Sequence, residues 1–321
     1  MIISVKILLV FIISLTVGLA LAYPVIFLCK KLKAQQTVLH YVEAHYSKSG
    51  TPTMGGIIFI LASLVGCACF LWVDCFYAWM SMLVMLAFGL LGFLDDFIKV
   101  HFHQNEGLSP LQKIIGQTAI AALIAVLVYF KIGGELTFFS LKFNIGWGII
   151  PFAIVVILAV VNSVNLTDGL DGLAGGTSFV YLLFFGAIVA LIGQPQQSSL
   201  SVAAFAVAGG VLAFLAVNTF PARIFMGDTG SLALGGFIAC LALFSGKILY
   251  IPIMGLMFVL SALSDIIQVA HYKRTHKRVF LMAPLHHHFE KKGVHENRIV
   301  TIYIIVTSLL SAVCLCLEIA L

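Results

Sequence analysis

Residues 3–28 read ISVKILLVFIISLTVGLALAYPVIFL, a run in which Lys6 is the single charged residue. About 20 apolar residues in a helix cross the hydrocarbon core of a bilayer, so this run predicts a membrane-spanning helix. The apolar run continues to Cys29 and then meets Lys30 and Lys31. We therefore expect the helix to be retained rather than cleaved as a signal peptide.

Similar apolar runs recur along the whole chain. Of the 321 residues, 61% are hydrophobic and only 10% are charged, whereas a soluble domain carries about 25% charged residues. The runs lack the alternation of barrel strands, and backbone groups at membrane depth need internal partners. We predict an all-α polytopic bundle, with 1–321 forming one integral membrane domain and no soluble domain. The ten expected spans are 3–28, 54–73, 77–96, 112–131, 147–164, 176–194, 199–218, 232–247, 250–271 and 299–319.

The loops between these spans form two sets that differ in charge. Ten spans place both termini on one side and five loops on the other, at 29–53, 97–111, 165–175, 219–231 and 272–298. The second side holds all but four of the 18 Lys and Arg residues. The positive-inside rule therefore predicts that this side is cytoplasmic and that both termini are extracytoplasmic.

The acids and histidines are a separate observation, because they do not contribute to that rule. All ten histidines, and every acid except Asp74, Glu135 and Glu318, lie on the basic side or in the helix ends that face it. Ionisable groups near a bilayer are costly and usually functional. We therefore expect a chemical site at this side of the bundle.

Asp95 and Asp96 close the third expected span, in the sequence GLLGFLDDFIKV. A charge costs about 2.5–3.5 kcal/mol at the centre of a membrane helix and less near its end, and adjacent carboxylates are costly without a cation. Consecutive helix positions differ by about 100°, so the two side chains suit different roles, one of them facing a metal or acting as a base. The alternative is a solvated helix end.

Asn165, Asp168 and Asp171 recur every three positions in VNSVNLTDGLDGLAGG. A helical turn there would align them in one polar stripe. The glycines of this stretch permit close backbone approach or positive φ, as expected where a loop surrounds a ligand. The alternative is a capped turn between two helices.

Asp228 lies between Gly227 and Gly230 in NTFPARIFMGDTGSLALGG, just before the eighth expected span. Thr229 and Ser231 are candidate caps of that helix. Backbone N–H groups at a helix start can hold phosphate, and a carboxylate there can hold Mg²⁺ that bridges phosphate oxygens. The motif is short and is weak evidence by itself. It supports a functional site because it lies on the same side of the membrane as the other acids.

His286, His287 and His288 are consecutive in APLHHHFE, within the largest basic loop. They suggest a role in substrate binding or in acid–base chemistry. Zinc binding is a competing interpretation, but no cysteine accompanies them and adjacent side chains rarely converge on one ion. A solvated loop is the third interpretation.

Other polar residues extend the expected site. Lys48 and Thr53 precede the second span and Lys113 begins the fourth, so all three are candidate phosphate contacts. Asp265 and Gln268 share a face of the ninth span, where they either extend the cleft or form hydrogen bonds between helices. This combination suits phosphoryl transfer, in which positioning and charge neutralisation supply most of the catalysis. ATP hydrolysis is not expected, because the sequence has no Walker A or kinase glycine loop.

The chain resembles the phospho-N-acetylmuramoyl-pentapeptide transferases of bacterial peptidoglycan synthesis in six strings, which occur in the order TPTMGG, FLDDFIK, LSPLQK, NLTDGLDGLAGG, FMGDTGS and PLHHHFE. The resemblance covers about residues 48–298. The PLHHHFE form is typical of this family, whereas hexosamine-phosphate relatives in the same superfamily carry a different histidine motif.

The resemblance implies transfer of phospho-MurNAc-pentapeptide from UDP-MurNAc-pentapeptide to undecaprenyl phosphate in the bacterial inner membrane, giving lipid I and UMP. It also implies that Mg²⁺ is the cofactor and that the protein forms a homodimer. We expect membrane lipid to contact the protein, and we expect no nucleic-acid partner. By motif, Asp95 and Asp96 match the catalytic acid pair, Asp228 the Mg²⁺ ligand, and His286, His287 and His288 the essential histidine motif. The matches to the nucleotide-sugar cleft are Lys48, Thr53, Asn165, Asp168, Asp171, Asn218, Phe225 and Gln268, with Phe225 suited to stacking on uracil.

We hypothesise that Asp95 or Asp96 deprotonates the polyprenyl phosphate, which attacks the sugar-proximal phosphate while Mg²⁺ on Asp228 stabilises the leaving UMP. A covalent aspartyl-phosphate route is the competing mechanism. Two other functions stay open, a related polyprenyl-phosphate GlcNAc-1-phosphate transferase and a membrane transporter. A transporter would place polar groups near the midplane, whereas the acids and histidines of this chain gather at one face.

Overall fold

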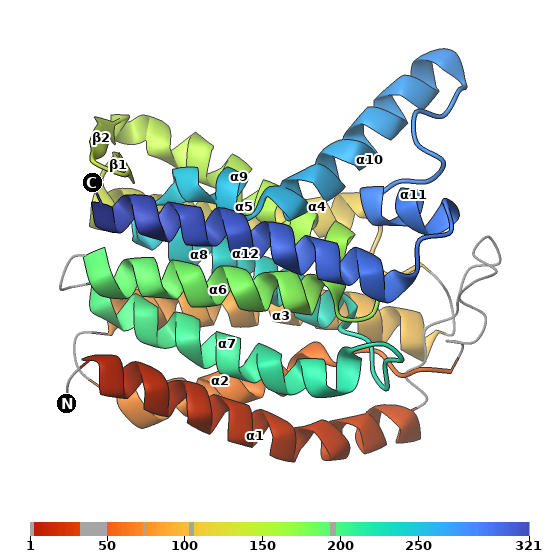
Figure 1. Cartoon of the computed structure of the whole chain (residues 1–321), viewed down its shortest axis with the longest axis horizontal. Helices are drawn as coiled ribbons and strands as arrows, with labels where there is room; N and C mark the ends of the chain where they lie inside the picture. The colour runs from red at the N-terminus through yellow and green to blue at the C-terminus, as the bar shows by residue number, and fades with distance from the viewer. Residues whose placement is uncertain (1–2, 33–49, 73–74, 103–105, 193–196, 321) are drawn as a thin grey trace.

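The structure, a computed structural model, describes residues 3–32, 50–72, 75–102, 106–192 and 197–320. Over these residues the chain forms a helical bundle with one short β-hairpin (Figure 1), as the apolar runs predict. The elements are α1 (Ile3–Lys31), α2 (Gly56–Phe70), α3 (Phe76–His101), α4 (Pro110–Ile132), β1 (Glu135–Phe138), β2 (Leu141–Asn144), η2 (Gly146–Gly148), α5 (Ile149–Thr167), α6 (Leu173–Ile192), α7 (Ser198–Asn218), α8 (Gly227–Phe244), η4 (Ile248–Tyr250), α9 (Ile251–Met254), α10 (Leu256–Thr275), α11 (Leu285–Lys291) and α12 (Glu296–Ala320).

Each of the ten expected spans has a helical counterpart. Among the described residues, eight helices are long and apolar enough to cross a membrane, and a bent pair made of Ile248–Met254 and Leu256–Thr275 adds a ninth. The tenth counterpart, α2, is apolar but only 15 residues long. The chain is therefore a multi-pass membrane protein.

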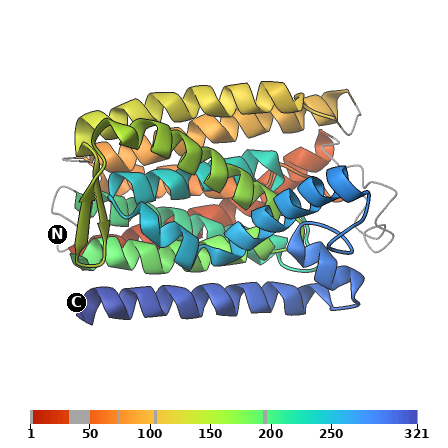
Figure 2. The ribbon, with the colours of Figure 1, turned by 90° about the horizontal axis from the view of Figure 1, so that it is seen from above.

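The long helices run side by side along the bundle, and α1 starts at the same end at which α12 finishes (Figures 1 and 2). The prediction that both termini lie on one side is confirmed. We call this end, which also carries β1 and β2, the hairpin end. The opposite end, where α11 lies, is called the site end.

The ninth expected span, 250–271, corresponds to two helices instead of one. It bends by 79° between α9 and α10, so that α10 projects away from the bundle in Figure 1. The break falls at Gly255, and Pro252 lies in the short helix before it. Proline and glycine are frequent causes of such breaks, but both residues stand inside an uninterrupted apolar run.

Helix α8 lies at the centre of the bundle. In its apolar membrane-spanning stretch 89% of the residues are buried, compared with 22% of the residues in that of α1. Small residues make this burial possible. A Cβ on Gly92 of α3 would overlap the carbonyl oxygen of Asp228, and Gly56 of α2 meets Gly230 of α8 equally closely. Small residues at helix contacts allow backbones to approach in membranes. These contacts fix the start of α8 between α2 and α3.

A buried ion pair ties the hairpin end together. Lys247, in the loop after α8, pairs with Glu318 of α12, and the Tyr250 hydroxyl donates to the same carboxylate. The Lys247 and Glu318 side chains are only 7% and 3% exposed. The Tyr250 hydroxyl also accepts a hydrogen bond from the Phe139 amide (2.8 Å), which connects the pair to the β-hairpin.

Candidate active site

Three carboxylates from two helices meet at the site end. Asp95 and Asp96 lie on α3 and Asp228 lies on α8, and each offers one oxygen within 4.8 Å of the others. Both α3 acids are buried, because α3 continues to His101 instead of ending at residue 96. The interpretation of this pair as a solvated helix end is therefore wrong.

Two lysines bridge the acids. Lys99 lies one helical turn after Asp95, with its Nζ 2.6 Å from the Asp95 Oδ2 and 3.0 Å from the Asp228 Oδ2. Lys113 places its Nζ 3.0 Å and 2.8 Å from the same two oxygens. Both lysine side chains are 28% exposed, whereas Asp228 is 16% and Asp95 1% exposed. The lysines and Asp228 are thus the accessible part of the cluster.

Lys113 was expected to contact phosphate, and the start of α4 explains how it reaches the acids. Ser109 and Gln112 form a capping box and Pro110 occupies the first turn, so the helix begins firmly at this point. Lys99 was missed as a site residue. Its spacing of four residues from Asp95 was the available signal, since such residues are neighbours on a helix face.

Asp96 holds the start of α8. Its carboxylate accepts hydrogen bonds from the Asp228 amide (3.2 Å), the Thr229 amide (2.9 Å) and the Thr229 hydroxyl (2.7 Å). Because α8 begins at Gly227, Thr229 and Ser231 lie inside the helix and do not cap it as expected. The two amides that could have held phosphate already donate to Asp96.

Asn165, Asp168 and Asp171 do not form the expected stripe, because α5 ends at Thr167. The Asn165 amide group donates to the Asp228 Oδ1 (2.8 Å), next to the acid cluster. Asp171 instead accepts from the Ala222 amide (3.0 Å) and connects two loops. Asn165 therefore contacts the cluster directly, whereas the bond of Asp171 to Ala222 connects loops.

Asp168 follows the end of α5 and interacts electrostatically with the carboxylates of the acid cluster. Burial, and then the carboxylates of Asp228 and Asp96, raise the pKa of Asp168 well above its usual range. A raised pKa means that the ionised form is disfavoured where it stands. The carboxylates of Asp228 and Asp96 therefore add to the cost that burial places on ionising Asp168.

Loop contacts place three other expected residues around the site. Asn218 is buried, and its side chain accepts from the Gly172 amide (3.0 Å) and donates to the Ile224 carbonyl (2.9 Å). The backbone of Phe225 pairs with Pro52 and Gly55. Thr53 is buried beside this turn, while Lys48 lies outside the described residues.

The three histidines point in different directions from α11. His286 is fully buried, and its Nε2 occupies the space that a side chain on Gly169 would need. This contact places α11 against the loop that carries Asp168. His287 pairs with Glu290 (2.9 Å), and His288 accepts from the Leu281 amide (3.1 Å).

Gln268 lies on α10 and binds the loop before α11. Its side-chain oxygen accepts from the Val279 and Phe280 amides, each at 3.0 Å. No contact joins it to the acids within the described part of the chain, so the expectation that it lines the cleft is not supported by a direct contact. Its bonds keep the histidine-bearing segment attached to α10.

The acid cluster fits a divalent cation better than the histidines fit zinc. In the residues that the structure covers, Asp95, Asp96 and Asp228 are the only group of three or more metal-type ligands close enough to share an ion. Carboxylate oxygens are the ligands preferred by Mg²⁺. The two lysines balance only part of the carboxylate charge, which leaves a net negative site.

The fold and this site define a membrane-embedded transferase, and residues 78–246 match Glycosyl transferase family 4. Residues 48–60 match phospho-N-acetylmuramoyl-pentapeptide-transferase signature 1. The protein of that name from Thermoanaerobacter sp. (strain X514) is 43% identical over 305 residues, covering 94% of this chain and 95% of its own. The one from Clostridioides difficile (strain 630) is 42% identical over 287 residues, covering 88% of each. The chain belongs to the phospho-N-acetylmuramoyl-pentapeptide-transferase family, which confirms the resemblance seen in its motifs.

Proposed function

We propose that this protein transfers phospho-MurNAc-pentapeptide from UDP-MurNAc-pentapeptide to undecaprenyl phosphate, at the cytoplasmic face of the bacterial inner membrane. An oxygen of the lipid phosphate bonds to the sugar-bearing phosphorus. The bond from that phosphorus to the bridging oxygen breaks, and UMP leaves with the electron pair. The observation that carries the proposal is the cluster of three acids and two lysines at the site end, in a chain whose relatives bear this enzyme's name.

Lys99 and Lys113 are proposed to bind phosphate oxygens. Each lysine side chain is partly exposed, and both ammonium groups pair with the same two carboxylates. When one lysine turns towards an arriving phosphate, the other can still pair with the acids. Ammonium groups on flexible stems suit this exchange of partners. The substrates would meet these lysines first, because Asp95 lies beneath them.

Asp95 is the proposed base, in preference to Asp96. Both oxygens of Asp96 already accept hydrogen bonds from α8, and taking up a proton would disrupt that contact. The Asp95 Oδ2 faces the two lysines. Movement of those lysines onto phosphate would expose this oxygen to the proton of the lipid phosphate.

Asp228, together with Asp95 or Asp96, is proposed to hold Mg²⁺. The cation would neutralise the charge that develops on the leaving UMP. Asn165 supports Asp228 by donating to its Oδ1, which leaves the Oδ2 directed at the lysines. This arrangement orients the accessible oxygen of Asp228 towards the substrate side of the cluster.

The remaining expected residues are proposed to form the nucleotide-sugar cleft. The segments 168–172 and 222–228 are joined directly by the Ala222 amide, which donates to Asp171. They are also joined through Asn218, which accepts from the Gly172 amide and donates to the Ile224 carbonyl, so they act as one wall. Phe225 belongs to this wall, and its aromatic ring is proposed to stack on uracil. The other proposed members are Lys48, Thr53, Asp168, Gln268, His286, His287 and His288.

Product identification tests the proposal directly. The purified protein is incubated with undecaprenyl phosphate, Mg²⁺ and either UDP-MurNAc-pentapeptide or UDP-GlcNAc, and the lipid products are identified by mass spectrometry. We expect lipid I from the first nucleotide sugar only, and no product after chelation of Mg²⁺. A product from UDP-GlcNAc alone would assign the chain to the related hexosamine-phosphate activity, and no lipid product with either donor would overturn the proposal.

Single-turnover kinetics distinguish the two mechanisms. If attack is direct, Asp95→Asn slows UMP release and no phosphorylated protein accumulates. A covalent aspartyl-phosphate route would instead release UMP before any lipid acceptor is added. A homodimer, which the family resemblance supports, is tested separately by native mass measurement in detergent.

A further inference from the structure

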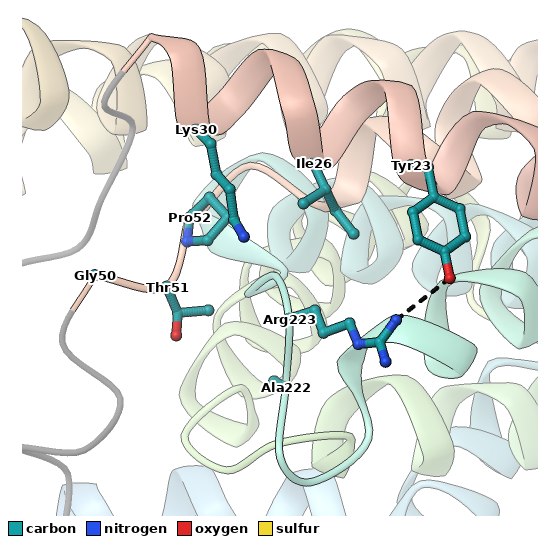
Figure 3. A pocket seen from close by; sticks show the side chains of 8 residues that line it. All are labelled: Tyr23, Ile26, Lys30, Gly50, Thr51, Pro52, Ala222 and Arg223. Carbon is teal, nitrogen blue, oxygen red and sulfur yellow. Dashed lines mark hydrogen bonds between the residues drawn. The ribbon is translucent and has the colours of Figure 1, made fainter.

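A second polar pocket lies at the site end, apart from the acid cluster. It has a volume of about 560 Å³, opens to the surface, and is lined by the last turns of α1, the segment 50–52 and the turn at 222–223 (Figure 3). Asp95, Asp96 and Asp228 do not contribute to its lining. The pocket is therefore separate from the three acids.

The lining chemistry is that of an anion site. Lys30 and Arg223 approach the pocket from α1 and from the opposite turn, and the hydroxyl groups of Tyr23 and Thr51 add hydrogen-bonding groups. Arg223 donates to the Tyr23 hydroxyl (3.3 Å), which holds its guanidinium at the pocket edge. Within the described residues no carboxylate pairs with Lys30 or Arg223. Arginine and lysine placed in this way are suited to a phosphate group.

The position of the pocket indicates a lipid phosphate. Lys30 lies in the last turn of α1, whose outer face is apolar and exposed; Tyr23 and Phe27 are 65% and 70% exposed. In a membrane protein such side chains face lipid, and tyrosine and basic residues gather at the headgroup level. Leu19, Tyr23 and Phe27 follow one another at four-residue spacing, so an acyl chain can lie along them while its headgroup enters the pocket.

One wall of the pocket is continuous with the active site. The Phe225 amide donates to the Pro52 carbonyl (2.8 Å), and the Gly55 amide donates to the Phe225 carbonyl (2.8 Å). Phe225 follows Arg223 by two residues and precedes Asp228 by three. A ligand that joins Lys30 to Arg223 would therefore brace the turn that positions Asp228.

We propose that this pocket binds the phosphate headgroup of an anionic phospholipid from the leaflet at the site end, and that the bound lipid stabilises the 222–228 turn. Lipid binding to the pocket does not depend on the proposed transferase activity. The effect of the bound lipid on turnover rests on the proposed function. The two parts are therefore measured separately.

Binding is measured on the full chain in detergent, by native mass spectrometry and by the unfolding temperature. Phosphatidylglycerol should bind about tenfold more tightly than phosphatidylcholine, and Arg223→Gln or Lys30→Gln should each lower that affinity about five- to tenfold. Lys31→Gln is the matched control, since Lys31 is the adjacent base on α1 but does not line the pocket. Tyr23→Phe removes only the hydroxyl that holds Arg223 and should weaken binding less.

Several outcomes would overturn the lipid site. Equal affinity for the two lipids would do so, as would an effect of Lys31→Gln as large as that of Lys30→Gln, which would indicate unspecific surface charge. Stabilisation by inorganic phosphate equal to that by the lipid would indicate a soluble anion. Displacement of phosphatidylglycerol by UDP-MurNAc-pentapeptide would assign the pocket to the substrate.

Turnover is then compared in vesicles of phosphatidylcholine with and without phosphatidylglycerol. The anionic lipid should raise the rate of the native chain, and Lys30→Gln, which lies outside the proposed substrate cleft, should lose this increase while keeping its rate in phosphatidylcholine. Lipid binding without any rate increase would overturn the stabilising role alone. A chain that binds the lipid but makes no lipid I under any condition would overturn the proposed function and leave the binding result intact.

Discussion

The two ends of the bundle each hold a cluster of opposite charges, but they differ in balance and in access. At the hairpin end, one ammonium group and one carboxylate, Lys247 and Glu318, are almost fully buried and matched. At the site end, three carboxylates lie together, and two partly exposed lysines pair with two of them, Asp95 and Asp228.

The difference in charge balance and exposure indicates that the ion pair at the hairpin end is structural and that the cluster at the site end binds ligands. Moving a matched ion pair out of water costs desolvation free energy, and the attraction between the two charges offsets little more than that cost. Such a pair therefore fixes the geometry of the helices more than it adds to the free energy of unfolding. An unmatched and accessible cluster has charge left for a cation and for substrate phosphates. The comparison therefore predicts that substitutions at the site end change activity, whereas those at the hairpin end change stability.

The largest expected effect is at the site end. Asp228→Asn should reduce the rate of UMP release about 10³- to 10⁴-fold, because it removes a charged ligand of the proposed cation from the reacting centre. The rate is measured per mole of folded protein. Glu318→Gln is the control at the hairpin end, and an equal loss of turnover in that variant would contradict the division between the two ends.

The next effect is on stability at the hairpin end. Lys247→Met leaves the Glu318 carboxylate buried without its cation, which should cost about 3–5 kcal/mol of unfolding free energy. Thermal unfolding in detergent measures the loss. The double variant Lys247→Met/Glu318→Leu should recover most of it, and a double variant as unstable as the single one would show that the pair itself supplies the stability.

A smaller effect is expected where α3 holds the start of α8. Asp96→Asn should lower the unfolding free energy by about 2 kcal/mol, because a charged acceptor of three hydrogen bonds is replaced by a neutral one. Thr229→Val removes only the hydroxyl bond and should cost about 1 kcal/mol. If Asp96→Asn lost activity but unfolded at the native temperature, Asp96 would have a chemical role instead.

The smallest effect concerns the pH dependence of stability. The raised pKa of Asp168 means that the folded chain holds this proton more firmly than the unfolded chain, in which the group ionises near about pH 4. Stability should therefore fall as the pH rises from that value towards the folded pKa. In metal-free buffer, the unfolding temperature of Asp168→Asn should vary less with pH over this window than that of the native chain. A steeper dependence in the variant would refute this account.

The sequence predicted the helices better than their ends. Apolar runs predicted a helix at each of ten positions and both termini at one end, and the charge pattern predicted Asp95, Asp96 and Asp228 at the opposite end. The bend at Gly255 was missed because the apolar composition continues across it. The extension of α3 to His101 was missed because Asp95 and Asp96 end the apolar run while the helix continues. The hairpin was missed because its two strands have four residues each, too few for a clear alternating pattern.

Within the site, the sequence could predict which residues take part but not which residues bind one another. The sequence identified Lys113 and Asn165 as site residues, yet it gave no sign that both would bind Asp228, 115 and 63 residues away from them. Asp96 and Thr229 are likewise separated by 133 residues. Such pairs follow from helix packing, which no local pattern encodes.

The contact of Asp96 with the start of α8 also determines how the site attracts its substrates. A helix N-terminus carries about half a positive charge, and here that dipole already faces a carboxylate of the protein. Incoming phosphates must therefore be attracted by the exposed ammonium groups of Lys99 and Lys113, whose field is screened by dissolved ions. Capture of the nucleotide sugar should consequently weaken as the ionic strength rises, more steeply than for an enzyme that binds phosphate with backbone amides.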